Sequence, residues 1–163
     1  MFSKKIVARE SDRSLDLPVC DRLDLEILEP FEAVEDQFQH GGVVFKNAIA
    51  LQPSNSAYPS HSSQILLMGA PRNGWMELIF KRPIRVFSCR VTSSRRLVLS
   101  AYDRKNRLLT SDELPRANLA QSDSPLPPNK PLRVVADKIS SITFYAFDGQ
   151  FAIDEISFCS RSF

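Results

Sequence analysis

The sequence lacks the features that define several large classes of protein. No run approaches the ~20 apolar residues of a membrane-spanning helix. The opening MFSKKIVAR holds only the short apolar run IVA, well below the ~7–15 residues of a secretory signal's apolar region. The formal net charge is +2, whereas nucleic-acid readers usually carry a concentrated basic patch. We therefore expect no membrane segment, no nucleic-acid partner and, without a leader, a cytoplasmic location.

Cysteine and histidine are too few and too scattered for the common metal and redox motifs. Cys20, Cys89 and Cys159 are widely spaced, with no CxxC pair and no histidine cluster, so we expect no zinc site. Three cysteines at this spacing suit a reducing compartment, or free thiols packed as small hydrophobic groups. His61 lies in PSHSS, but no Gly-x-Ser-x-Gly or other nucleophile motif accompanies it. We expect no enzyme activity.

Short apolar stretches separated by proline, glycine and polar residues make up most of the chain. The 163 residues include 11 prolines, 11 phenylalanines and five glycines, and 43% of the chain is hydrophobic. About ten strand-like segments follow one another without a long 3.6-residue period, which indicates a sandwich or a barrel. Asp148-Gly149, between two such segments, is the strongest hairpin signal. We predict an all-β jelly-roll β-sandwich of two antiparallel sheets.

The sequence divides into an N-terminal arm, residues 1–21, and one sandwich domain, residues 22–163. The arm mixes charges with short apolar runs and includes an expected edge strand at residues 5–9. The first strand of the domain is predicted at Leu23–Leu28, LDLEIL, because apolar side chains alternate there with acidic ones.

The last strand is predicted at Phe151–Phe158, FAIDEISF, and it carries one carboxylate that breaks the apolar pattern. Counting every second residue places Asp154 on one face with Ala152, Ile156 and Phe158. An unpaired carboxylate on a buried face is costly, so Asp154 needs a partner. That partner is a metal ion, a basic side chain or several backbone N–H groups.

Four stretches in this order resemble a known group of domains. They are LDLEIL, then VEDQFQHGGVVFKNAIAL followed by YPSHSSQILL, then LVLSAYDRKNRLL, and finally FAIDEISF. The likeness covers roughly residues 23–158. It is to bacterial jelly-roll domains of the galactose-binding-like or carbohydrate-binding-module type, and in particular to small domains of exported proteins with a PEP-CTERM sorting tail. Ser63 stands where that group usually has glycine, and Glu155 replaces its second aspartate.

The resemblance implies one structural calcium ion where the first and last strands meet. Its ligands would be Asp154, Asp24, Glu26 and backbone carbonyls near Asn47. Carboxylates at positions i and i+2 of a strand point the same way, and calcium takes about six to eight oxygen ligands. The alternative is that Asp24 and Glu26 face water while Asp154 accepts bonds from a loop or an arginine.

The resemblance also implies a non-catalytic binding module that recognises a glycan or a protein partner. Tyr58, in a long polar loop, and Trp75, at the start of a strand, are the candidate residues for stacking on a sugar. We expect Tyr102 and Tyr145 to be core or edge aromatics. The alternative function is an intracellular structural or assembly protein that uses the sandwich as a protein–protein surface, as a homodimer for example.

Basic residues between positions 81 and 96 place positive charge along one stretch of the chain. They include Lys81, Arg82 and Arg85, and the run RVTSSRR follows them. Most such runs are solvated surfaces, but this one could bind an acidic partner.

Overall fold

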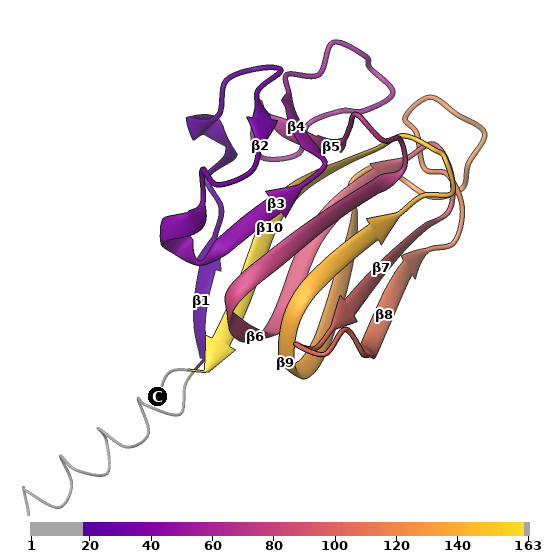
Figure 1. Ribbon diagram of the computed structural model, residues 1–163. Helices are drawn as coiled ribbons and strands as arrows, with labels where there is room; N and C mark the ends of the chain where they lie inside the picture. Colours follow the sequence, from indigo (N-terminus) through magenta and orange to yellow (C-terminus); the bar gives the residue numbers. More distant parts are fainter. Residues whose placement is uncertain (1–17, 162–163) are drawn as a thin grey trace, which may run out of the picture.

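The computed structural model describes residues 18–161, which form ten strands and two short 3₁₀ helices (Figure 1). In chain order these are β1 (Pro18–Arg22), η1 (Leu25–Ile27), β2 (Ala33–Val34), η2 (Gln39–Gly41), β3 (Val43–Lys46), β4 (Ala48–Leu51), β5 (Leu66–Gly69), β6 (Trp75–Ser93), β7 (Leu97–Tyr102), β8 (Leu108–Leu114), β9 (Lys130–Tyr145) and β10 (Phe151–Arg161). Within these residues no helix is long and apolar enough to cross a membrane. The edge strand expected at residues 5–9 lies outside the described residues, while residues 18–21 of the expected arm belong to β1.

Two long strands, β6 and β9, belong to both layers of the sandwich. They pair antiparallel from Trp75↔Tyr145 to Val91↔Lys130, with register shifts on either side of Ile84 where the paired strands bend over (Figure 1). The residues Lys81-Arg82-Pro83 at the bend of β6 are exposed. Each strand therefore contributes one half to each layer.

The first layer, named here the β3 layer, contains β3, residues 75–80 of β6, residues 139–145 of β9, β7 and β8. The second, the β10 layer, contains β2, β4, β5, β10, residues 84–93 of β6 and residues 130–135 of β9, with β1 paired to the end of β10. The all-β sandwich prediction is confirmed. Hydrogen bonding nevertheless runs through the bends, so the two layers are parts of one ten-stranded sheet.

Phenylalanine rings hold the two layers together. Phe80 lies 5.1 Å from Phe158 and 6.3 Å from Phe87, measured between ring centroids. Phe144 contacts Phe87 at 6.1 Å and Phe151 at 5.8 Å, again across the sandwich. Full burial of one such side chain contributes about 1.5–3 kcal/mol. The core therefore lies between the two halves of the bent β6–β9 pair, with β10 contributing Phe151 and Phe158 from the second layer.

The opening strand predicted at Leu23–Leu28 is wrong. This segment turns into η1, because the Asp24 carboxylate accepts a hydrogen bond from the Glu26 backbone N–H at 3.1 Å and caps the turn. Leu25 and Leu28 are buried, while Ile27 is 58% exposed, so the apolar alternation does not define one face. The first strand is β1, which lies just before this segment and pairs with β10.

The face assigned to Asp154 is also wrong, because β10 contains a β-bulge. Asp154 pairs with Arg90 and Ser157 pairs with Ser88, so β10 advances three residues while β6 advances two. Glu155, inside the bulge, has φ = 50°. The bulge shifts the phase of the strand, and the apolar residues that reach the core from both sides of it are Phe151, Ile153, Ile156 and Phe158. Asp154 lies on the outer face of the β10 layer.

Two of the three cysteines form a disulfide, which corrects the expectation of free thiols. Cys20 of β1 and Cys159 of β10 are directly opposite in the ladder and bonded to each other, 139 residues apart in sequence. Cys89 is free and buried, as expected of a packed thiol. Its burial, with a smaller contribution from the charge of Asp112, raises the pKa of the Cys89 thiol far above its usual range. It is therefore an unreactive core residue.

We expect the disulfide to stabilise the sandwich, because it closes a loop that contains nearly the whole domain. Reduction, or replacement of both Cys20 and Cys159 by serine, should lower the free energy of unfolding by about 2–4 kcal/mol. Urea unfolding with and without reductant measures this loss. The double variant is the control, since its midpoint should not respond to reductant. A wild-type midpoint that is equally insensitive would contradict the crosslink.

Candidate functional site

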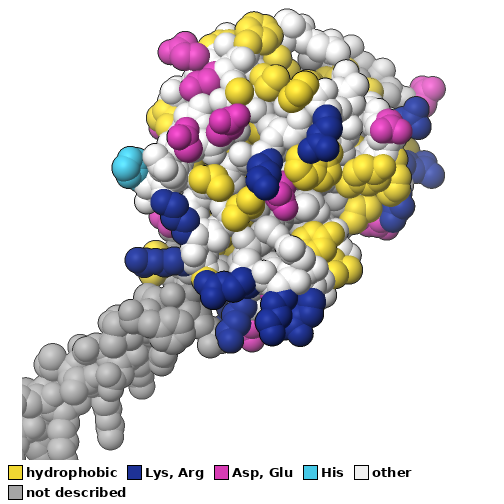
Figure 2. All heavy atoms as spheres, viewed as in Figure 1, with side chains coloured by type: hydrophobic (Ala, Val, Ile, Leu, Met, Phe, Trp, Pro, Cys, Tyr) yellow, Lys and Arg dark blue, Asp and Glu magenta, His cyan; other side chains and the backbone are white. Residues whose placement is uncertain are grey.

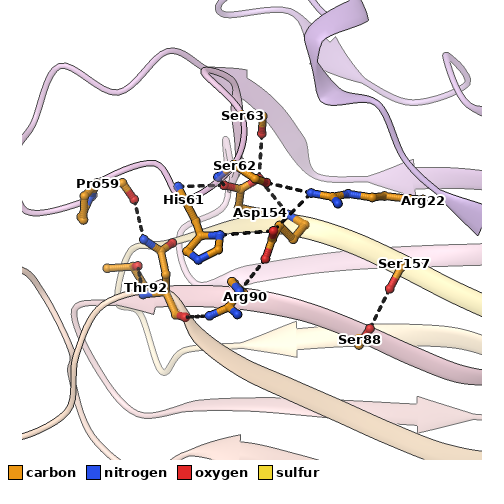
Figure 3. Close-up of polar contacts among 12 residues, drawn as sticks. Arg22, Pro59, His61, Ser62, Ser63, Ser88, Arg90, Thr92, Asp154 and Ser157 are labelled. Carbon is orange, nitrogen blue, oxygen red and sulfur yellow. Dashed lines mark hydrogen bonds and ion pairs between the residues drawn. The ribbon is translucent and has the colours of Figure 1, made fainter.

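Asp154 is buried under the loop that precedes β5, although it lies on an outer face of the sheet. It is 1% exposed. Its Oδ2 accepts the backbone N–H groups of His61 (3.1 Å) and Ser62 (3.2 Å). Its Oδ1 accepts the Ser63 hydroxyl (2.7 Å) and its neighbour's backbone N–H (2.8 Å). Figure 3 shows the carboxylate reaching these donors. Of the partners considered for Asp154, the structure therefore shows the backbone N–H groups of a loop.

The next residue, Glu155, joins three basic groups from three segments of the chain. Its Oε1 lies 3.2 Å from Arg22 of β1 and 3.2 Å from His61 Nδ1, while its Oε2 accepts a hydrogen bond from Arg90 of β6. Partial burial acts to raise the pKa of Glu155. The hydrogen bond from Arg90 and the charges of His61 and Arg90 outweigh that effect, so the pKa lies below its usual range. Together with Asp154, it fastens the loop to β1, β6 and β10.

The residues predicted to hold calcium do not fit a cation. Asp24, Glu26 and Asp154 do line one hollow, but the Asp154 oxygens already accept four hydrogen bonds from donors. Asp24 caps η1, and Glu26 accepts the Gln64 backbone N–H. Across residues 18–161, no three His, Cys, Asp or Glu side chains form a group that could hold a metal ion. A cation there would displace donors and leave them unpaired.

Asn47 is the fourth predicted calcium residue, and its side chain serves a different part of the fold. Its amide nitrogen donates to the carbonyls of Arg72 and Trp75, both at 2.7 Å, and its amide oxygen accepts the Arg72 N–H at 3.0 Å. The backbone of Asn47 has φ = 60°, which asparagine tolerates better than most residues. Its role is to hold the turn that enters β6.

Replacing Asp154 by alanine should destabilise the domain and free the loop. The loss should be about 2–4 kcal/mol, because each buried donor that loses its acceptor costs ~1–3 kcal/mol unless water reaches it. Urea unfolding gives the energy, and hydrogen exchange at the His61 and Ser62 amides reports the loop. Asp123→Ala, at an exposed carboxylate, is the matched control and should change stability by less than about 0.5 kcal/mol.

The same urea unfolding experiment is repeated with added calcium and with a chelator. Because donors surround Asp154, neither added calcium nor EDTA should shift the urea midpoint of the wild type. A stabilisation by calcium that Asp154→Ala abolishes would show that the loop rearranges into a metal site, contrary to the arrangement described above.

Tyr58 does not present its ring for stacking, which corrects its assignment as a sugar-binding residue. Its side chain is 6% exposed and packs with Leu66 and Ala152. Its hydroxyl donates to the Gln150 carbonyl at 3.2 Å, and burial raises the pKa of Tyr58. The aromatic ring thus anchors the polar loop, and it lies in a small apolar cluster beside the main core.

Trp75 does lie on the surface, at one end of the β3 layer. It pairs directly with Tyr145 of β9, and Tyr145 pairs directly with Val98 of β7. Directly paired residues share a face, and their neighbours along each strand are buried in the core. Tyr145 is 43% exposed and contacts the 40% exposed Phe147 edge-to-face at 4.7 Å between centroids. Trp75, Tyr145 and Phe147 are named here the aromatic row.

Arginines border the aromatic row at both ends. The guanidinium of Arg72 lies 4.6 Å from the centre of the Trp75 ring, and that of Arg96 lies 5.2 Å from the centre of the Phe147 ring. Arg96 also bonds Glu113. Such cation–π contacts stabilise the rings in fixed positions. Figure 2 shows hydrophobic side chains over this layer with Lys and Arg side chains beside them.

A polar row runs parallel to the aromatic row, one pleat further along the strands. Glu77 pairs with Thr143, which pairs with Ser100, and Lys46 of β3 lies 3.8 Å from Glu77. The outer face of the β3 layer therefore places rings beside hydroxyl, carboxylate and ammonium groups.

Sequence reasoning found Trp75 but assigned Tyr145 to the core or an edge, and it did not consider Phe147. The available signal was the alternation of Thr143 and Tyr145 with buried Ile142 and Phe144, which turns Tyr145 outward. Phe147, with φ = 48°, belongs to the turn after β9 and carries no periodic signal.

No protein-family model and no curated protein matches the sequence. Among solved structures, a DUF4465 family protein from Bacteroides caccae has a TM-score of 0.46 at 8% identity, over 88% of this chain and 87% of that one. A variant of the family 29 carbohydrate-binding module CBM29-2, complexed with mannohexaose, has 0.45 at 7%, over 88% and 93%. The xylan-binding domain CBM22-1 of Paenibacillus barcinonensis Xyn10C has 0.39 at 13%, over 90% and 99%.

Two of these three structures are carbohydrate-binding modules, the class that the sequence resemblance named. They lend no support to the part of the resemblance that concerns PEP-CTERM-sorted proteins, which stays a prediction. At TM-scores below 0.5, these likenesses assign neither a family nor a ligand to the chain.

Proposed function

We propose that the domain is a non-catalytic carbohydrate-binding module, with its ligand site on the outer face of the β3 layer. The aromatic row carries this proposal. Tyr145 and Phe147 are exposed, and Trp75 is partly exposed. Rings that reach the surface in fixed positions offer apolar surfaces on which the CH faces of a sugar can stack, while a polar row beside them can bond its hydroxyls. Trp75 and Tyr145 are the proposed stacking residues.

The neighbouring side chains supply the polar groups that a sugar site needs to bond hydroxyls. Thr143 and Ser100 have hydroxyls that both donate and accept hydrogen bonds, and Glu77 accepts them. Arg72 covers one face of the Trp75 ring, so a sugar would stack on the remaining ring surface and receive N–H donors from the guanidinium. A protein partner would use the same face differently, through a larger contact with an apolar centre and a polar, hydrated rim.

The Cys20–Cys159 disulfide supports a place of action in an oxidising compartment, contrary to the cytoplasmic location expected from the sequence. Thiol labelling of the protein from its native cells, after denaturation without reductant, should modify Cys89 alone. Labelling of Cys20 or Cys159 would contradict an oxidising location.

A glycan array and affinity electrophoresis through soluble plant and bacterial polysaccharides test the binding site. We expect retardation by at least one polysaccharide, weakened about tenfold or more by Trp75→Ala or Tyr145→Ala, because tenfold corresponds to about 1.4 kcal/mol and full burial of a large apolar side chain contributes about 1.5–3 kcal/mol. The free energy of unfolding of each variant is measured in parallel, so that lost binding is distinguished from lost folding.

Val135→Ala is the matched control, because this apolar side chain is 50% exposed but lies in the half of β9 that belongs to the β10 layer. It should leave glycan binding unchanged. A flat array, or binding that survives the loss of both Trp75 and Tyr145, would overturn the proposed site.

A further inference from the structure

Acidic and basic side chains form two separate groups on the surface. Figure 2 shows a group of Asp and Glu side chains at the upper left, named here the negative end, and a group of Lys and Arg side chains along the lower edge, named here the positive end, while both signs are mixed elsewhere on this face. The negative end comes from residues 24–36, named here the acidic segment, and no lysine or arginine occurs between residues 23 and 45. Its carboxylates are Asp24, Glu26, Glu29, Glu32, Glu35 and Asp36. Among the described residues, none of the six takes part in an ion pair.

Two apolar side chains project from the acidic segment. Phe31 is 76% exposed, the largest value among the large hydrophobic residues described, and Ile27 is 58% exposed. The backbone of Phe31 is fixed, since its N–H donates to the Ala50 carbonyl of β4 at 2.8 Å. The segment thus presents an apolar knob surrounded by negative charge.

The positive end contains a hollow with the opposite properties, named here the basic hollow. It has a volume of about 670 Å³, and the side chains of Phe80, Ile84 and Phe158 reach it from the core. Lys81 and Arg82, both exposed, stand on its rim. The hollow is large enough to admit a phenylalanine ring.

A second hollow, of about 590 Å³, continues the first around the bend of β6 and β9. The two share Arg82, Ile84 and Ser160, and the second adds Arg85 and Lys138. Four cationic side chains therefore face two carboxylates, Asp21 and Asp137, of which Asp137 is paired with Arg85 at 3.8 Å. The groove keeps an excess of positive charge around an apolar floor.

We propose that the basic hollow binds the acidic segment of a second copy of this chain, with Phe31 entering the hollow. The two surfaces are complementary in both charge and polarity. Burial of the Phe31 ring supplies the apolar term, while Lys81 and Arg82 face the carboxylates around Phe31. Because the two surfaces are different patches of the same chain, the contact is heterologous, that is, head-to-tail. This self-association is independent of the aromatic row.

Sedimentation velocity of the wild type, from micromolar to millimolar protein, tests the contact. The weight-average mass should rise above that of the monomer in ~0.01 M salt and fall back in ~1 M salt, where the Debye length shrinks from ~30 to ~3 Å. Lys81→Glu/Arg82→Glu and Glu29→Lys/Glu35→Lys should each weaken association by about tenfold or more. Phe31→Ala should weaken it without changing its dependence on salt.

The decisive measurement mixes the Lys81→Glu/Arg82→Glu protein with the Glu29→Lys/Glu35→Lys protein. Each alone brings like charges together, whereas the mixture restores an acidic segment opposite a basic hollow, so association should return. Arg95→Glu/Arg116→Glu makes the same charge change at exposed sites outside both surfaces and should have much less effect. Urea midpoints confirm that every variant is folded. A wild type that stays monomeric at millimolar concentration in low salt, or a mixture that fails to associate, would overturn the proposal.

Discussion

The hydrogen bonds between β6 and β9 hold both layers of the sandwich in place. Because the paired strands bend together, residues 75–80 and 84–93 of one strand face each other across the core, and Phe80 comes to lie against Phe87. Each of the remaining strands pairs, directly or through its neighbours, with either β6 or β9. The aromatic row, the loop over Asp154 and the basic hollow all take their positions from it, since Trp75 begins β6, Arg90 lies in its second half and Lys81 lies at its bend.

Much of the fold could be predicted from local patterns, since the segments 75–80, 84–92 and 97–102 have strand-like composition and are bounded by turn residues. The turn at Asp148-Gly149 is present, but the hairpin predicted there is wrong, because β9 and β10 each pair with β6 and not with each other. What could not be predicted depends on contacts distant in sequence or on single backbone angles. LDLEIL has the alternation of a strand, but the Asp24 carboxylate satisfies a backbone N–H and favours a 3₁₀ turn. The bulge at Glu155 shows in the sequence only as a three-residue step between the buried Ile153 and Ile156, where an unbroken strand would have a step of two.

For the candidate sites too, the local sequence predicts some features, and others depend on contacts between residues distant in the chain. The need of Asp154 for a partner followed from the cost of burying charge, but which partner it has depends on the loop of His61–Ser63 that folds over it. Tyr58 lies in a polar loop, and only the tertiary structure turns its ring into the small cluster with Leu66. The pairing of Cys20 with Cys159 likewise could not be deduced from three widely spaced cysteines. The surface position of Trp75 could be predicted, because a residue at the start of a strand has fewer neighbours to bury its side chain.

The first and last described strands are neighbours, and a covalent bond joins them. A unit whose entry and exit points adjoin can be inserted within a surface turn of a larger polypeptide without stretching its host. It could equally be pulled from both sides under mechanical load, and the sulfur–sulfur bridge would then bear the force while the sandwich behind it stays folded. The geometry of β1 and β10 thus makes the domain suited to modular architectures in which it is spliced between other folded parts.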